Sequence, residues 1–251
     1  MLSILDLFTE QVPLLSPSQI SNQLNLTRPT AYRYLKELTQ AGLLTSTNGH
    51  YGLGPRIIQL DYQMRNADPM LRDGETSVRA LAEQFGGTVL LTAMYGDTIV
   101  NTHQIDGTAE VTVKFGRGHV MPLAVSATSK ILLANMRRTA LKKLYTKYGQ
   151  TRDFQKIGND WSSFLTSMNS VRARGHHISF AELDDALVGI AAPIATSEGH
   201  VANAITLILH QDQFDLFNQQ AIIVALKQSA EHLQRNINTP KKEEAAENLA
   251  V

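Results

Sequence analysis

The sequence contains no cysteine, which excludes disulfide bonds and thiolate metal sites. It also lacks an apolar run of about 18 residues and an N-terminal signal pattern, so we expect a cytoplasmic protein without a membrane partner. Positive charge is not in excess either, because 23 Lys and Arg residues balance 23 Asp and Glu residues. Any contact with nucleic acid must therefore come from a local surface rather than from a protein-wide field.

Common catalytic signatures are missing as well. No Gly-x-Ser-x-Gly motif occurs, and a Ser-x-x-Lys motif ending at Lys130 would need serine where Ala127 stands. Ser126 and Lys130 are one helical turn apart, which favours a helix cap followed by a surface lysine over a nucleophile with its base. The sequence therefore predicts no catalytic serine here.

Other polar groups are weak candidates for chemistry. His176 and His177 are adjacent, so on a strand they would point to opposite faces, and no histidine partner is nearby. The acidic stretch from Glu182 to Asp185 is more typical of a solvated turn than of an acid/base pair. The segment Gly116-Arg117-Gly118 is a weak anion-binding candidate outside a strand-to-helix context. We expect no metal site and no cofactor.

What is present is ordinary globular composition: 251 residues, 43% apolar and 18% charged, enough for one large domain or two smaller ones. A small helical part precedes a β-rich part with helices, which predicts a two-domain α+β protein. This order suggests a DNA-binding domain followed by a sensor domain.

The N-terminal part carries the signals of a winged helix-turn-helix. In Ser16-Pro17-Ser18-Gln19, Ser16 can cap a helix, Pro17 can begin it and Gln19 can complete a capping box. Asn25-Leu26-Thr27 has the length of the tight turn, and Thr27 can cap the second helix. Short strands around Asn48-Gly49 predict a hairpin, which directly after a recognition helix forms a wing.

The second helix places Ala31, Leu35 and Leu38 on one side, leaving the other side for DNA. Residues 1 to 60 hold four cations and three anions, so the local charge is only +1 and affinity would depend on dimerisation. The predicted DNA-contacting residues are Thr27, Arg28, Pro29, Thr30, Tyr32, Arg33 and Lys36, with His50 or Asn48 on the wing.

Periodicity predicts the remaining elements. Expected helices cover residues 2–8 (ended by Pro13), 55–67, 70–85 (irregular at Gly74), 126–136, 139–148, 161–174 (ended by Gly175) and a final helix with Phe214, Phe217, Ala221, Leu226, Leu233 and Ile237 inward. Expected strands cover 88–94, 98–105, 111–115, 177–181, 188–195 and 201–210, the last two joined by a turn with Gly199.

Three segments resemble the IclR family of bacterial transcription regulators. They are the winged-helix segment Leu26 to Gly54, the segment Gly118 to Ala134 with Pro122-Leu123-Ala124-Val125-Ser126-Ala127, and the segment Gly175 to Pro193, which ends Ile190-Ala191-Ala192-Pro193. The resemblance implies a winged helix-turn-helix in residues 1–54, a linker helix in 55–70 and a GAF-like effector-binding domain in 71–238. Residues 239–251, rich in Lys, Glu and Ala, are expected to form a flexible tail.

The resemblance also implies a homodimer or dimer of dimers on a palindromic double-stranded operator, with a small organic acid bound by the C-terminal domain. By position, the effector site would comprise Leu123, Ala127, Thr128, Ser179, Gly189 and Thr206, with the Ala127 and Thr128 N–H groups meeting the ligand. The sequence departs from the family where Ala124 replaces a frequent histidine, Ser129 a glycine, Ser179 an acidic residue and Gly189 a cysteine. These replacements leave room, so we expect a bulkier, even aromatic, carboxylate.

Two other functions compete with this interpretation. An enzyme acting on a small carboxylate would use the N-terminal part only as a dimerisation module, and the missing nucleophile and metal motifs argue against it. A ligand-free architectural or partner-binding protein would have an empty or collapsed pocket.

Overall fold

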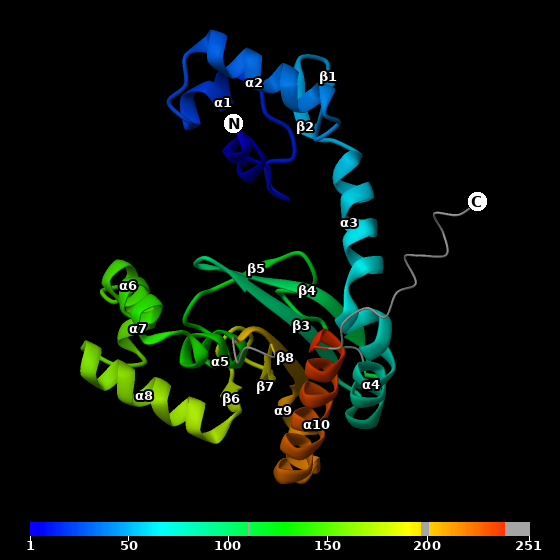
Figure 1. Ribbon diagram of the computed structural model, residues 1–251, viewed down its shortest axis with the longest axis vertical. Coiled ribbons are helices and arrows are strands. Elements are labelled where there is room, and N and C mark those ends of the chain that lie inside the picture. The colour runs from blue at the N-terminus through cyan, green and yellow to red at the C-terminus, as the bar shows by residue number, and fades with distance from the viewer. Residues whose placement is uncertain (110, 197–200, 239–251) are drawn as a thin grey trace. The chain divides into compact units, whose positions relative to one another are not determined.

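The computed structural model describes residues 1–109, 111–196 and 201–238, which form two compact units, Met1–Asp68 and Pro69–Val251 (Figure 1). Each unit is considered by itself. The predicted tail and the turn at Gly199 lie outside the described residues. No helix among the described residues has the length and apolar character needed to cross a membrane.

The first unit is a winged helix-turn-helix. Its elements are the 3₁₀-helix η1 (Leu2–Leu7), α1 (Pro17–Gln23), α2 (Arg28–Gln40), β1 (Leu44–Thr47), β2 (His50–Leu53) and α3 (Arg56–Ala67). Side chains that include Ile4, Ile20 and Leu35 form its core. The first element is a 3₁₀-helix that stops at Leu7, so Pro13 does not end it as predicted.

Local sequence explains two features of this unit. The predicted capping box is confirmed: Gln19 N–H donates to Ser16 Oγ at 3.3 Å, and Ser16 N–H donates to Gln19 Oε1 at 2.8 Å. The wing is confirmed as well, because β1 and β2 pair around Asn48 and Gly49, whose φ angles are 52° and 77°. Asn and Gly accept these positive φ angles, as a tight hairpin turn requires.

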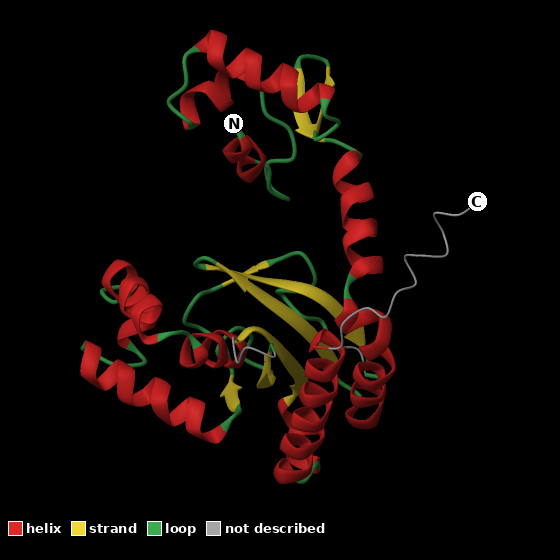
Figure 2. Cartoon of the chain, in the orientation of Figure 1, coloured by secondary structure: helices red, strands yellow, loops and turns green. Residues whose placement is uncertain are grey.

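The second unit is one antiparallel sheet in the order β5-β4-β3-β8-β7-β6, with helices on both faces (Figure 2). The strands are β3 (Thr88–Tyr95), β4 (Thr98–Asp106), β5 (Val120–Met121), β6 (His177–Phe180), β7 (Leu187–Ala195) and β8 (Val201–His210). The helices are α4 (Pro69–Phe85), α5 (Ala127–Asn135), α6 (Arg138–Tyr148), α7 (Arg152–Gln155), α8 (Trp161–Arg174), α9 (Gln211–Leu216) and α10 (Gln219–Asn238).

Alternation along the strands divides the core of this unit into two layers. On β7, Val188 and Ile190 pack in the layer that holds α4 and α10, whereas Ala191 packs in the layer that holds α5, α6 and α8. The inner strands β8 and β7 are apolar on both faces because helices cover both. Gly189 opens to the α5 side, where the candidate pocket lies.

Three predictions for this unit are wrong. Residues 111–115 form no strand, and the edge strand is β5 instead. The final helix is two helices, α9 and α10, and Ala221 is exposed whereas Ile222 is buried. Gly74 lies in an unbroken α4, where a Cβ would collide with the Leu233 side chain, so glycine allows α4 and α10 to approach closely.

Candidate functional site

The outward face of α2 presents most of the predicted DNA-contacting residues. Ala31, Leu35 and Leu38 are buried, which turns the other side of the helix toward solvent. Exposed there are Thr27, Arg28, Pro29, Tyr32, Arg33 and Lys36, and His50 is exposed on the wing, whereas Thr30 is half-buried. The structure therefore brings these residues to one surface with the geometry of a recognition helix.

The cations of this surface have no carboxylate partner in the part of the chain that the structure describes. Among the described residues, Arg28, Arg33 and Lys36 form no ion pair, and the Arg33 guanidinium lies 5.3 Å from the Tyr34 ring. The side chain of Thr27 does not cap α2 as predicted, because its hydroxyl pairs with that of Thr30 at 2.8 Å. Donors and unpaired cations on a rigid helix suit phosphate and base-edge contacts.

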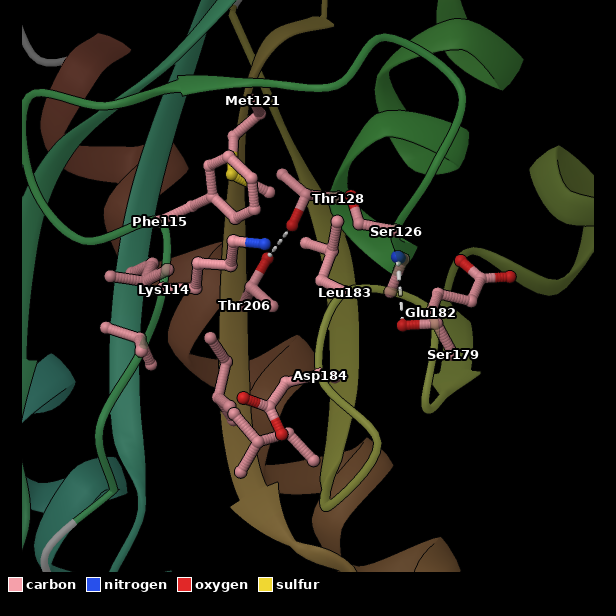
Figure 3. A pocket seen from close by; sticks show the side chains of 16 residues that line it. Lys114, Phe115, Met121, Ser126, Thr128, Ser179, Glu182, Leu183, Asp184 and Thr206 are labelled. Carbon is pink, nitrogen blue, oxygen red and sulfur yellow. Dashed lines mark hydrogen bonds between the residues drawn. The ribbon is translucent and has the colours of Figure 1, made fainter. Parts of the chain in front are cut away.

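The second unit contains a pocket between the N-terminus of α5, strands β7 and β8, and two loop segments (Figure 3). Five of the six predicted effector residues line it: Ala127, Thr128, Ser179, Gly189 and Thr206. The sixth, Leu123, is not a lining residue and packs instead against the core beneath α5. The cavity has a volume of about 60 Å³.

Polar groups meet on one wall of this pocket. The Thr128 and Thr206 hydroxyls form a hydrogen bond of 2.7 Å, and their residues are 2% and 3% exposed. Ala127 N–H donates to Ser179 Oγ at 3.1 Å. That N–H group, expected to meet the ligand, thus already has an acceptor, whereas no hydrogen bond of the Thr128 N–H is found among the described residues.

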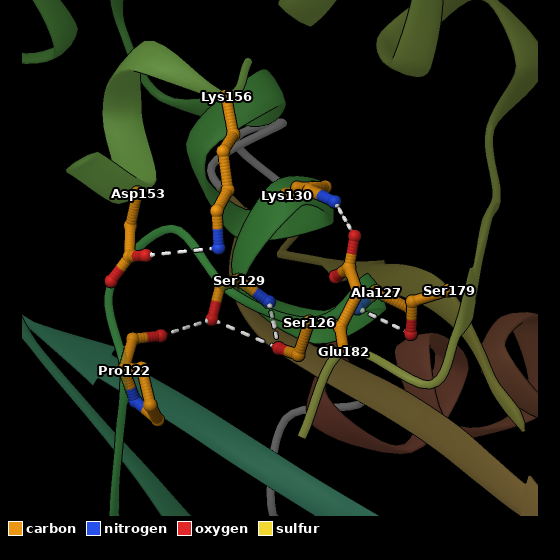
Figure 4. A network of polar contacts seen from close by, with 9 residues as sticks. All are labelled: Pro122, Ser126, Ala127, Ser129, Lys130, Asp153, Lys156, Ser179 and Glu182. Atoms are coloured by element: carbon orange, nitrogen blue, oxygen red, sulfur yellow. Dashed lines mark hydrogen bonds and ion pairs between the residues drawn. The ribbon is translucent and has the colours of Figure 1, made fainter. Parts of the chain in front are cut away.

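Ser126 holds the start of α5 in a strained conformation. Its φ angle is 139°, which L-residues rarely adopt, and such strain amounts to about 1–3 kcal/mol. Its Oγ accepts from Ser129 N–H at 3.1 Å, and Ser129 Oγ donates to the Pro122 carbonyl at 2.6 Å (Figure 4). The cap interpretation of Ser126 is confirmed. Lys130 forms an ion pair with Glu182, so it does not serve Ser126 as a base.

The acidic stretch after β6 closes one side of the pocket. Glu182 binds Lys130, whose side chain is only 14% exposed, and Asp184 Oδ1 accepts from Ala186 N–H at 3.1 Å. Ala181, with a φ angle of 52°, turns the chain from β6 into this stretch. Each of these two carboxylates therefore stabilises the fold through a contact of its own, Glu182 with Lys130 and Asp184 with the Ala186 N–H, and both residues also line the pocket.

His177 lies beside this stretch and is held neutral. Burial, together with the positive charges of Lys130 and Arg174 and the neighbouring His176, lowers the pKa of His177 to about 4. Among the described residues no group of three or more His, Asp or Glu side chains lies close enough to hold a metal ion.

Sequence reasoning missed one wall of the pocket, formed by Val113, Lys114 and Phe115. The mistaken strand assignment for residues 111–115 hid these side chains. Hydrogen bonds far apart in the sequence place this loop, including one from Asn101 Nδ2 to the Phe115 carbonyl at 2.5 Å. No local pattern signals such a contact. The one hint in the sequence is that Lys114 stands between the apolar residues Val113 and Phe115.

A winged helix-turn-helix with an outward cationic face, joined to a domain with a largely apolar pocket, defines a class: DNA-binding transcriptional regulators with a sensor domain. Residues 69–235 match the family profile described as bacterial transcriptional regulator IclR C-terminal, and residues 1–47 match the IclR helix-turn-helix domain. The chain therefore belongs to the IclR family of transcriptional regulators, as its sequence resemblance predicts.

Individual relatives agree with this assignment. The chain is 25% identical over 211 residues to the Pca regulon regulatory protein of Pseudomonas putida, covering 83% of this chain and 72% of that protein. It is 22% identical over 203 residues to the p-hydroxybenzoate hydroxylase transcriptional activator of Acinetobacter baylyi, covering 79% and 75%. The matched relatives are regulators, so the enzyme alternative is not supported.

The fold also matches solved structures. A crystal structure of a regulator of this family from Silicibacter sp. TM1040 superposes with a TM-score of 0.81, covers 95% of both chains and has 19% sequence identity. At that identity the likeness concerns the fold alone.

Proposed function

We propose that this regulator senses a small organic acid in the pocket beside α5 and thereby changes operator binding or promoter activity of a catabolic operon. The observation that carries the proposal is the pocket wall where the Thr128 N–H and the Thr128–Thr206 hydroxyl pair meet at a helix N-terminus. A helix N-terminus favours an anion, and hydroxyls can orient a carboxylate. The proposed domains are 1–54 for DNA, 55–70 as linker and 71–238 for the effector, acting in the cytoplasm.

The acid we propose is a bulky or aromatic carboxylate. Much of the remaining lining is apolar and includes Leu90, Met121 and Ile208, and Gly189 leaves a gap beside Ser179. The regulator from Acinetobacter baylyi is named for an enzyme that acts on p-hydroxybenzoate, an acid of this kind.

Calorimetry against a panel of organic acids tests this proposal. The panel should run from two-carbon acids to benzoate, 4-hydroxybenzoate and phenylacetate. We expect saturable binding of the larger acids. Binding confined to two- and three-carbon acids would refute the bulky class while leaving acid sensing in place, and no binding at all would refute acid sensing.

DNA contact by the outward face of α2 is the second part of the proposal. Arg33→Ala removes an unpaired cation, and one such contact contributes about 1–3 kcal/mol, so promoter binding should weaken roughly 5- to 150-fold. Arg138→Ala, an exposed arginine at the start of α6, is the matched control. Electrophoretic retardation of the promoter beside its own gene gives the measurement. Equal retardation by both variants would remove α2 from the interface.

We also propose a homodimer or dimer of dimers. Helix α3 has no buried residue, and it exposes large apolar side chains: Ile58, Tyr62 and Met64 are 73%, 61% and 58% exposed. Large apolar side chains repeated along one helix are typical of an interface. A second copy of α3 would cover them, and a palindromic operator would then meet two recognition helices. Sedimentation of Ile58→Glu should show loss of the dimer; an unchanged assembly would place the interface elsewhere.

A further inference from the structure

The loop between β4 and β5 carries a lysine that neither its local sequence nor the family resemblance assigns to a function. We propose that Lys114 is the group that binds the effector's anion, and that the effector is a monocarboxylate with an apolar body. This inference rests on the proposed acid-sensing function and narrows the class of acid. It follows from how the loop is held, from the charges around the pocket, and from the character of its walls.

The loop is fixed to the sheet, so the direction of Lys114 is set by the fold. Asn101 Nδ2 donates to the Phe115 carbonyl at 2.5 Å, and Gly118 N–H donates to the Asn101 carbonyl at 2.8 Å. Arg117 Nε donates to the Thr102 carbonyl at 2.8 Å on the same strand. Directly before these anchors Lys114 lines the pocket, and its side chain points into it (Figure 3).

The charges around the pocket leave the Lys114 ammonium available. Lys114 is the only Lys or Arg among the described lining residues, and its Nζ lies 5.7 Å from the centroid of the Phe115 ring. Glu182 is bound by Lys130, and Asp184 accepts from the Ala186 N–H. Neither carboxylate forms an ion pair with Lys114. A cation directed into an apolar pocket without a carboxylate partner is suited to an anionic ligand.

The same charges limit the ligand to one carboxylate. Lys114 and the Thr128 N–H can receive a single anionic group. A second carboxylate would meet Asp184, a lining residue without a cationic partner among the described residues, where like charges repel. The rest of the ligand would instead contact Met121, Leu183 and Ile208, which favour an apolar body.

The test compares matched acids on matched variants of the full-length protein. The monocarboxylates are benzoate, phenylacetate and hexanoate; phthalate and adipate are dicarboxylates of similar size, and benzamide is the neutral analogue of benzoate. Lys114→Met keeps the length of the side chain and removes its charge, whereas Lys114→Arg keeps the charge. Lys143→Met, an exposed lysine of α6, controls for loss of charge elsewhere in the same unit.

We expect the tightest monocarboxylate to lose about tenfold or more in affinity with Lys114→Met, less with Lys114→Arg and nothing with Lys143→Met. Each dicarboxylate should bind wild type at least about tenfold more weakly than its monocarboxylate counterpart, as should benzamide. Because Lys114 is exposed, Lys114→Met should keep the wild-type unfolding curve.

Three results would overturn the inference. Equal affinity of wild type and Lys114→Met for an acid would remove Lys114 from the site, while the acid-sensing proposal would stand. Tighter binding of a dicarboxylate would refute the single-carboxylate class. If none of these acids binds, this inference fails, and the acid-sensing proposal fails with it when the two- and three-carbon acids do not bind either, a result distinguishable from the first two.

Discussion

The hydroxyl pair between Thr128 and Thr206 gives the sharpest prediction about the pocket. In the Thr206→Val variant a methyl group replaces one hydroxyl, so the Thr128 hydroxyl loses its 2.7 Å partner while remaining 98% buried with its residue. An unsatisfied buried hydroxyl destabilises a protein by about 1–3 kcal/mol. We expect Thr206→Val and Thr128→Val each to lower the free energy of unfolding by about 1–2 kcal/mol.

The double variant should be less destabilised than the sum of the two. With both hydroxyls replaced by methyl groups of the same shape, neither polar atom is left unpaired, and the net change should be about 0–1 kcal/mol. The coupling energy between the two substitutions is then about 1–4 kcal/mol. Thr and Val are both β-branched, so backbone preferences change little in α5 or β8.

The protein carries a suitable reporter for this cycle. Trp161 is the only tryptophan, and it packs against Tyr145 at 5.4 Å between ring centroids in the second unit. Its fluorescence during urea unfolding therefore follows the unit that contains the pocket. Additive effects of the two substitutions, within about 0.3–0.5 kcal/mol, would refute a mutually satisfied pair.

Two further predictions concern the same unit. The pKa of His177 is lowered to about 4 in the folded protein, so as pH falls the unfolded chain binds the proton first and stability is lost between about pH 6.5 and 4. Discounted for the partial exposure of His177, the loss of unfolding free energy is about 1–2 kcal/mol. Unfolding followed by Trp fluorescence across this pH range should show the loss in wild type and not in His177→Gln. In Gly189→Ala the new Cβ would lie 3.2 Å from Ser179 Oγ and fill part of the pocket. Calorimetry should therefore show that, relative to wild type, affinity falls more for large acids than for small ones. An equal fall for acids of all sizes would contradict this placement of Gly189.

Sequence reasoning succeeded where structure is determined locally. The capping box at Ser16, the Asn48-Gly49 turn and the left-handed Gly175 after α8 each depend on residues within four positions of one another. The outward face of α2 followed from helical periodicity alone. The pocket residues on α5, β6, β7 and β8 came from family resemblance, since no local pattern places α5 beside residues 52 and 78 positions further along the chain.

The failures concern contacts between distant segments. The alternation in residues 111–115 is typical of a strand, but Asn101 anchors them as a loop, so Lys114 was not a candidate. Within its own helix Gly74 predicts an irregularity, whereas its actual role is to leave room for the side chain of Leu233, which is far along the chain. The sequence does not signal the break between α9 and α10, because Phe214, Phe217 and Ala221 continue through it at helical spacing. Each error reflects tertiary structure overriding a local pattern.

The Ser179 hydroxyl competes with the ligand for the Ala127 N–H group. Its Oγ already occupies that donor, 3.1 Å away, so such a ligand must first displace the serine. The observed affinity is then the intrinsic affinity multiplied by the fraction of molecules in which Ser179 has turned away. The threshold concentration at which the regulator responds would thus be tunable by one side chain, through its hydrogen bond to the Ala127 N–H.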